Sequence, residues 1–274
     1  MTQARALLVG LKEVSRKSYG DLWSAGCELS ENNVDQMASV LTGFSKALLK
    51  TKEATADNIL LEMKRSSDLL REGDIFVFYF AGHGFGGGPS EARHMLGSYD
   101  QPLDTRKFGE IWNSFDLGVR IVMISDSCNS GTDYSKYLAS LRERHGLDSE
   151  LGAAMDWTPL SPFMTDRQAN SMRAQMLHFG AASDGEPAIG GEFTKVLLSI
   201  WNNGSFSGGY RKFFCRILSR VNMNFPGLQR PEYRPYGPVT DTFEAQRPFD
   251  VAVPDSSNNI VNQGILRLGD CSAV

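Results

Sequence analysis

The sequence predicts a three-layer α/β domain with a mainly parallel central sheet and helices on both of its faces. Residues 74–80 and 120–124 are almost continuously apolar, as expected for strands that are covered on both sides. Such runs alternate along the chain with segments of helical period, a pattern typical of parallel sheets. With 274 residues, 41% hydrophobic and 22% charged, the chain can bury a sizeable core.

The remaining elements follow from the same periodicities. A first buried strand is expected over residues 5–11, followed by a helix over residues 31–49 and a second helix over residues 55–71 that Gly73 ends. A further strand is expected over residues 176–182, and further helices over residues 105–115, 134–145, 192–201 and 210–223. Residues 146–173 lose periodicity, and the proline-rich segment after Asn224 indicates an extended wrap around the domain.

The composition argues against several classes of partner. The formal net charge is −4, so no global basic field favours nucleic acid or an anionic membrane. The N-terminus lacks the apolar length of a signal peptide, and no apolar run is long enough to span a membrane, so we expect a cytoplasmic protein. The cysteines are far apart and form no CxxC pair, which predicts four reduced thiols, namely Cys27, Cys128, Cys215 and Cys271.

Two short segments, residues 80–84 and 125–131, carry the chemistry. Each follows an expected buried strand, and the first contains His83 while the second contains Cys128, 45 residues later. Functional groups gather beyond the carboxyl ends of parallel strands, so the thiol and the imidazole are expected at one edge of the sheet. A cysteine attacks a carbonyl as the thiolate, and a histidine can take its proton and later protonate the leaving amine. The N–H groups of Gly84 and Cys128 are candidate donors to the developing oxyanion.

Asp126 is the candidate specificity residue. It stands two positions before Cys128, so in strand geometry both side chains point to the same side. A carboxylate in a substrate pocket favours a cationic partner, which predicts cleavage after Arg or Lys.

Tyr79-Phe80-Ala81-Gly82-His83-Gly84 together with Asp126-Ser127-Cys128-Asn129-Ser130-Gly131 resembles the two catalytic motifs of the caspase-like cysteine peptidases, and metacaspases and their bacterial relatives more than animal caspases. In caspases a Gln-Ala-Cys signature follows the histidine by about 50 residues. Here Asp-Ser-Cys takes its place. The resemblance implies the three-layer caspase-like fold, a His83–Cys128 dyad that works through a thioester acyl-enzyme, and an acid at position 126 that selects Arg or Lys.

The resemblance extends over about residues 5–205 and implies a division of the chain. One domain is expected over residues 1–274, with residues 1–145 similar to a caspase large subunit, residues 146–175 an irregular loop and residues 176–274 similar to a small subunit plus the wrap. Residues 182–184 followed by residues 191–194 resemble the start of the small subunit, and thereby Ser183 and Asp184 become substrate-binding candidates. Because the family is often cut in the intervening loop, we hypothesise self-cleavage at Arg167 or Arg173.

Two features depart from the metacaspase pattern. In metacaspases a second pocket acid commonly follows a Gly-Cys pair, which is present here as Gly26-Cys27. The best alignment puts Asn33 at the position of that acid, with Asp35 as a displaced substitute. Many metacaspases also need calcium, but no acidic set aligns here, so the sequence predicts no required cofactor and leaves calcium open.

Two rival functions stay open at this stage. One is a catalytically silent scaffold or regulatory module of the same fold, against which the retained histidine and cysteine argue. The other is an esterase or acyltransferase that uses the same dyad. The expected partners are a protein or peptide substrate and an activating protein, with no nucleic acid and no membrane, and the bacterial relatives suggest a role in defence or regulated cell death.

Overall fold

The computed structural model describes residues 2–19, 27–86, 94–103, 105–127, 171–182, 188–253, 259–261, 264, 266 and 268–271. Its centre is a six-stranded sheet with the strand order β2-β1-β3-β7-β8-β9. The first five strands in this order are parallel and β9 is antiparallel to β8. The strands are β1 (Ala4–Gly10), β2 (Ser45–Lys50), β3 (Ile75–Gly82), β7 (Arg120–Ser127), β8 (Gln175–Gly180) and β9 (Glu232–Tyr236).

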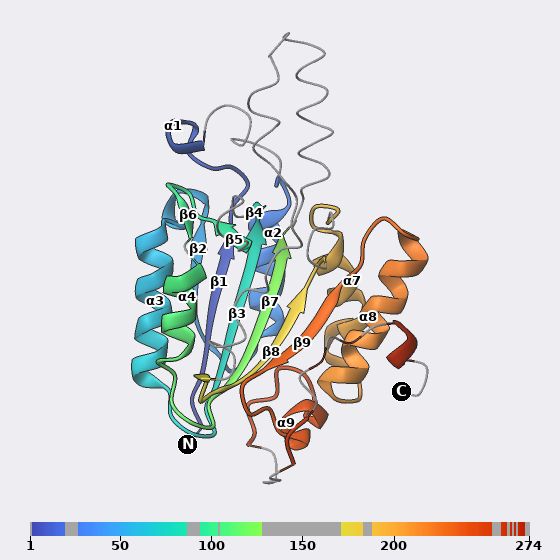
Figure 1. Ribbon diagram of the computed structural model, residues 1–274. Coiled ribbons are helices and arrows are strands. Elements are labelled where there is room, and N and C mark those ends of the chain that lie inside the picture. Colours follow the sequence, from blue (N-terminus) through green and yellow to red (C-terminus); the bar gives the residue numbers. More distant parts are fainter. Residues whose placement is uncertain are drawn as a thin grey trace.

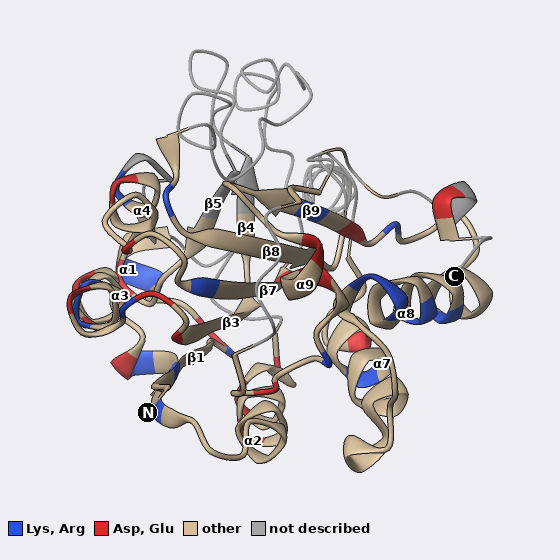
Figure 2. Cartoon of the chain, turned by 90° about the horizontal axis from the view of Figure 1, so that it is seen from below, with Lys and Arg blue, Asp and Glu red and all other residues tan. Residues whose placement is uncertain are grey.

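Helices cover both faces of this sheet, which confirms the predicted three layers (Figures 1 and 2). One face carries α2 (Ser30–Val40), α7 (Glu192–Trp201) and α8 (Tyr210–Asn224), and the other carries α3 (Ala56–Leu69) and α4 (Thr105–Trp112). The smaller elements are α1 (Arg16–Tyr19), α9 (Asp241–Ala245), the 3-10 helices η1 (Thr51–Glu53), η2 (Asn202–Gly204) and η3 (Leu268–Cys271), and a second sheet of β4 (Gly84–Gly86), β5 (His94–Gly97) and β6 (Pro102–Leu103).

The apolar run of β3 supplies both cores. Val77 and Tyr79 pack into the core on the side of α2, α7 and α8, whereas Phe76, Phe78 and Phe80 pack into the core on the side of α3 and α4. Successive side chains of a strand point to opposite faces, so a strand that is buried on both sides has no polar face. This is the physical reason for the continuous hydrophobicity of residues 74–80.

The helix expected over residues 31–49 was predicted too long. The structure ends α2 at Val40, and Gly43 adopts a φ of +82°. This left-handed conformation suits glycine and turns the chain. Residues 45–50 then form the edge strand β2 instead of the last turns of a helix.

Most of the other expected elements are confirmed within one to three residues. The helix over residues 192–201 has the predicted bounds, and the helix over residues 55–71 appears as α3, with the Thr55 side chain accepting from Asn58 N at 3.3 Å. The sheet of β4, β5 and β6 and the strand β9 were not expected. β9 contains Pro235, which is tolerated because β9 lies at the edge of the sheet. The helix expected over residues 134–145 lies outside the described residues.

Arg120 attaches the C-terminal segment to the sheet. Its buried guanidinium donates hydrogen bonds to Gln246 Oε1 at 2.6 Å and to the carbonyl oxygens of Gly73, Val251 and Ala252 at 2.7, 3.0 and 2.8 Å. One side chain at the beginning of β7 therefore binds the turn before β3 and residues 246–252 together. The extended wrap after Asn224 stays a prediction, since within that segment the structure places the sheet strand β9 and the helix α9.

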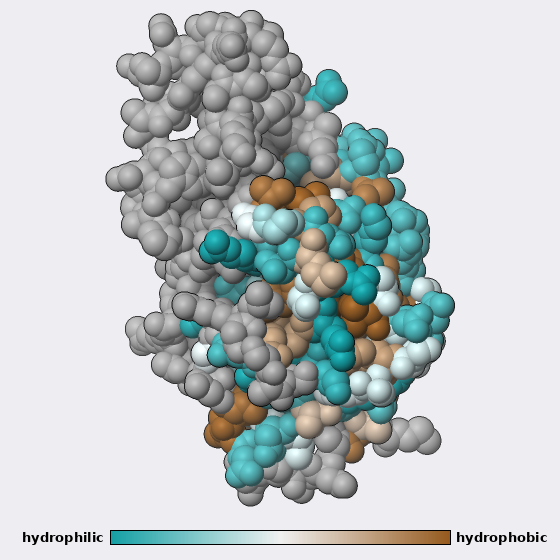
Figure 3. Space-filling view, turned by 90° about the vertical axis from the view of Figure 1, so that its right-hand side faces the viewer, coloured by the Kyte–Doolittle hydropathy of each residue, from teal (hydrophilic) through white to brown (hydrophobic). Residues whose placement is uncertain are grey.

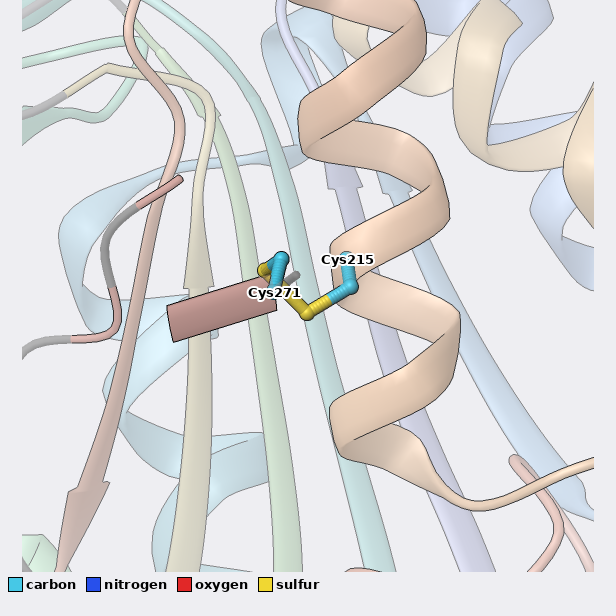
Figure 4. The surroundings of a disulfide bond; sticks show 2 residues. All are labelled: Cys215 and Cys271. Carbon is cyan, nitrogen blue, oxygen red and sulfur yellow. A yellow bond between two sulfur atoms is a disulfide. The ribbon is translucent and has the colours of Figure 1, made fainter. Parts of the chain in front are cut away.

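The cysteines correct one prediction from the sequence. Cys215 of α8 and Cys271 of η3 form a disulfide, with their Cα atoms 5.4 Å apart (Figure 4). Spacing along the sequence could not indicate this pair, since the two residues are 56 positions apart. The disulfide anchors the end of the chain near the sheet edge, where Leu266 forms an antiparallel bridge with Tyr233 of β9.

The surface is mixed in character. In the coloured part of Figure 3, hydrophilic residues predominate and hydrophobic residues lie in separate groups. Among the residues described, no helix combines the length and the apolar character needed to cross a membrane.

The disulfide predicts a loss of stability when it is removed. Cys271→Ser should lower the free energy of unfolding by about 2–4 kcal/mol, because the cross-link restricts the unfolded chain. Denaturant unfolding under non-reducing conditions measures this, with Cys27→Ser as a matched cysteine control. Thiol titration of the unfolded, unreduced protein that finds four thiols would contradict the pairing.

Candidate active site

His83 lies directly after β3, at the carboxyl edge of the parallel sheet. β3 and β7 pair in register up to Gly82 and Ser127, so both motifs leave the sheet at the same level. His83 is half-buried, and its carbonyl oxygen accepts a hydrogen bond from Gly97 N at 2.8 Å. The structure thus places the histidine at the edge where the sequence predicted it.

The structure describes only some of the other site residues that the sequence predicted. Gly84 begins β4 and is buried, and Arg173 is exposed two residues before β8. Cys128 follows Ser127, the last residue of β7, but lies outside the described residues. Arg167, Ser183 and Asp184 lie outside them as well.

A different cysteine contacts His83. The Sγ atom of Cys27 lies 3.8 Å from both Nδ1 and Nε2 of the imidazole. Cys27 carries a thiol and is half-buried just before α2. The sequence contained the Gly26-Cys27 pair but gave no sign that its thiol reaches the histidine, because the two residues are 56 positions apart.

The carboxyl group of Asp126 is held by the N-terminal turn of α7. Its Oδ2 atom accepts hydrogen bonds from Thr194 N at 3.1 Å and from Thr194 Oγ1 at 2.6 Å. The side chain is 5% exposed. A helix N-terminus offers N–H groups and a positive dipole end, which favour a carboxylate.

Two further polar side chains belong to this buried cluster, which we call the Asp126 cluster (Asn33, Tyr79, Asp126 and Thr194). The Tyr79 hydroxyl lies 2.7 Å from Thr194 Oγ1, and Asn33 of α2 lies beside Tyr79. Asn33 is buried, and its Nδ2 has no hydrogen-bond partner among the described residues. Both hydrogen bonds to Asp126 end on Oδ2, so Oδ1 is the acceptor left for another group.

Burial sets the charge state of this cluster. It raises the pKa of Asp126 to about 6, although the two hydrogen bonds from Thr194 act in the opposite direction. Burial also raises the pKa of Tyr79 well above its ordinary value, so this side chain stays a neutral phenol. A strongly perturbed carboxyl group at the carboxyl edge of a parallel sheet is typical of a functional site.

Asp35 does not join the Asp126 cluster. Its carboxylate is exposed and pairs with Lys50 Nζ at 2.6 Å, at the end of the edge strand β2. In the structure Asn33, and not Asp35, lies beside Tyr79 of β3.

A close contact between α2 and β1 fixes the position of Asn33. A Cβ atom on Gly10 would lie 2.6 Å from both Ser30 O and Val34 Cγ2, so only glycine lets α2 pack this closely on the end of β1. The first turn of α2 is thereby brought to the carboxyl edge of the sheet.

The described residues contain no group of three or more His, Cys, Asp or Glu side chains that could hold a metal ion. The calcium question raised by the sequence therefore stays untested.

Sequence reasoning missed two members of the Asp126 cluster. Thr194 belongs to residues 191–194, which resemble the start of the small subunit. Nothing in its type or spacing indicates that it binds Asp126. Tyr79 stood in the first motif and was treated as a core residue of a strand. Thr194 lies in the first turn of a helix expected after the neighbouring strand, and the N–H groups of a first helical turn can bind a carboxylate. This position was the available sign of its contact with Asp126.

Comparisons with known proteins support the caspase-like fold. A family model described as the caspase domain matches residues 3–237. The crystal structure of protein GSU0716 from Geobacter sulfurreducens is similar with a TM-score of 0.72 and 26% sequence identity, over 92% of this chain and 100% of that chain. Caspase-1 from Spodoptera frugiperda shares the fold, with a TM-score of 0.56 and 13% identity over 84% of this chain and 85% of that chain. Comparison with curated proteins gave no match.

The buried carboxyl of Asp126 predicts an unusual effect on stability. Between its ordinary pKa of 3.8 and about 6, the folded chain keeps a proton that the unfolded chain has lost, so the free energy of unfolding falls as the pH rises through this range. Above it the cost of the buried charge is about 3 kcal/mol, at about 1.36 kcal/mol per pKa unit.

Asp126→Asn removes that charge and keeps an oxygen for the Thr194 donors. We expect it to raise the midpoint of thermal unfolding at pH 8, with a smaller gain at pH 4. A variant that melts below the wild type at pH 8 would show that the charged carboxylate stabilises the fold.

Proposed function

Because the chain belongs to the caspase domain family, we propose that it is a cysteine endopeptidase in which Cys128 is the nucleophile and His83 is its base. The observation that carries this proposal is the position of His83 at the carboxyl edge of β3, in register with the strand that leads to Cys128. A caspase-like fold with this histidine supplies the frame that the dyad needs.

The proposed reaction follows from the chemistry of the pair. His83 takes the thiol proton, and the thiolate attacks the peptide carbonyl to form a tetrahedral intermediate. The N–H groups of Gly84 and Cys128 are the proposed oxyanion donors, and His83 then protonates the leaving amine. Water hydrolyses the resulting thioester.

The proposed specificity rests on Asp126. Thr194 fixes the carboxyl group through Oδ2 and leaves Oδ1 to accept from a cationic substrate side chain. An approaching guanidinium or ammonium would stabilise the carboxylate that burial disfavours. This compensation supports Arg or Lys before the cleaved bond. With Asn33 where a second acid was expected, Asp126 is the proposed charge that contacts the substrate, and the nearby carboxylate of Glu192 in α7 adds to its raised pKa.

Activation is proposed to involve either self-cleavage or a protein partner. Arg173 is exposed and lies two residues before β8, next to the buried Ala174. We propose Arg167 and Arg173 as the self-cleavage positions, with protein or peptide substrates and no required cofactor. A role in bacterial defence or regulated cell death, from the cytoplasm, remains part of the proposal and rests on the family resemblance.

Hydrolysis of fluorogenic peptides tests the dyad and the pocket together. We expect turnover of peptides with Arg or Lys before the cleaved bond, and its loss by about 10²- to 10⁴-fold in Cys128→Ala and in His83→Ala. Calcium and a chelator are compared in parallel. Turnover of Asp or Leu peptides alone would refute the pocket.

If the folded protein hydrolyses none of the peptides, the result would favour a catalytically inactive scaffold or regulatory module. Turnover of activated esters without any peptide turnover would favour an esterase or acyltransferase.

The pKa of Asp126 predicts the pH dependence of specificity. Protonation removes the charge that selects Arg, so kcat/KM for an Arg peptide, divided by that for the matched neutral citrulline peptide, should fall as the pH drops through about 6. The ratio cancels the titration of the dyad, which both substrates share. A ratio that stays constant between about pH 5 and 8 would show that the charge of Asp126 does not determine the preference for Arg over citrulline.

Self-cleavage is tested by incubating the purified wild type beside Cys128→Ala. Mass spectrometry and N-terminal sequencing should find new ends after Arg167 or Arg173 in the wild type alone. Arg173→Gln then separates the two positions. Identical intact masses of both proteins would refute self-cleavage.

A further inference from the structure

Cys27 is a nucleophile at the site that the proposed reaction does not use. Its Sγ is equally far, 3.8 Å, from the two ring nitrogens of His83, so the sulfur lies against the imidazole itself. The side chain is half-buried, as is that of His83. Cys27 is therefore partly exposed to solvent, and anything attached to its sulfur must lie next to the ring.

We propose that Cys27 is a reversible modification site at which a small disulfide forms a mixed disulfide and blocks His83. The blocking effect rests on the proposed role of His83 as the base of the peptidase, whereas the reactivity of Cys27 does not. The reagent class is a low-molecular-weight disulfide such as oxidised glutathione.

The exchange needs only the thiol, the imidazole and the disulfide. His83 accepts the proton of the Cys27 thiol, and the thiolate attacks one sulfur of the small disulfide. The new S–S bond to Cys27 forms as the original S–S bond breaks, and the second half leaves as a thiolate that takes up a proton. Excess small thiol reverses the same steps, so the block is reversible.

The structure distinguishes Cys27 from two of the other cysteines. Cys215 and Cys271 are already joined, and Cys215 is 6% exposed. Neither provides a thiol. Activation of a cysteine requires a nearby cation or base together with access to solvent, and Cys27 meets both conditions.

The first experiment uses Cys128→Ala, in which the disulfide leaves Cys27 as the single thiol. Its rate of reaction with oxidised glutathione at pH 7 is followed by intact mass. We expect the additional change His83→Ala to slow the reaction by about tenfold or more, because an ordinary thiol is only slightly ionised at this pH. Cys128→Ala with Cys27→Ser is the control that should gain no mass. Equal rates with and without His83 would overturn the proposed activation.

The second experiment tests the block in an enzyme that keeps Cys128. Cys27→Phe holds a group larger than the thiol permanently beside His83, whereas Cys27→Ser keeps the original size. We expect Cys27→Phe to hydrolyse the preferred peptide more slowly than Cys27→Ser by about 10²-fold or more, the range that general base catalysis contributes. Thermal unfolding of both variants verifies that they fold.

Equal turnover by the two folded variants would overturn the block. If the wild type hydrolyses no peptide at all, the block falls with the proposed function, and the first experiment still decides whether His83 activates Cys27. If Cys27→Phe does not fold, the wild type is treated with oxidised glutathione and the loss of activity is compared with the occupancy of each cysteine by peptide mapping. Loss that follows Cys128 alone would then refute the block.

Discussion

β3 and β7 pair in parallel from Ile75 and Arg120 to Gly82 and Ser127, and the whole candidate site is positioned from that pairing. Both strands are buried on both faces. A shift of the pairing by one residue would therefore move each side chain of the shifted strand from one core to the other. The register also aligns Asp126 with Ala81, one pair before the strands end. Packing of the two cores therefore determines where His83 and Asp126 lie and where β7 ends before Cys128.

The Asp126 cluster, at the same edge of the sheet, buries a carboxyl group at a cost to the stability of the fold. Hydrogen bonds from Thr194 offset part of the burial of the carboxyl group, but its pKa still rises to about 6. At neutral pH the charged form is therefore less stable in the folded chain than in water. A fold selected for stability alone would favour a neutral group at this position, whereas the proposed cationic substrate would turn the cost into binding energy.

Much of this arrangement could be predicted from the sequence, because hydrophobic periodicity reports burial directly. The continuous runs in β3 and β7 predicted the parallel sheet, and His83 followed from its position after such a run. Contacts between distant segments could not be predicted, as the Cys215–Cys271 disulfide and the Thr194–Asp126 hydrogen bonds illustrate. β2 was missed because Ser45–Lys50 has no strand pattern of its own and gains its ladder only from β1. Asp35 is suggested by its residue type, whereas Asn33 is the α2 residue that belongs to the Asp126 cluster.

Covalent labelling tests whether Cys128, His83 and Asp126 act together on a substrate with Arg before the cleaved bond. The protein is treated with a peptidyl acyloxymethyl ketone that carries Arg next to the reactive group, and in parallel with the matched Asp and citrulline reagents, and the adduct is located by peptide mapping. The account predicts an adduct of the Arg reagent on Cys128, absent in His83→Ala and strongly reduced in Asp126→Asn. An adduct with equal preference for all three reagents, or one that forms without His83, would contradict the proposed dyad and pocket.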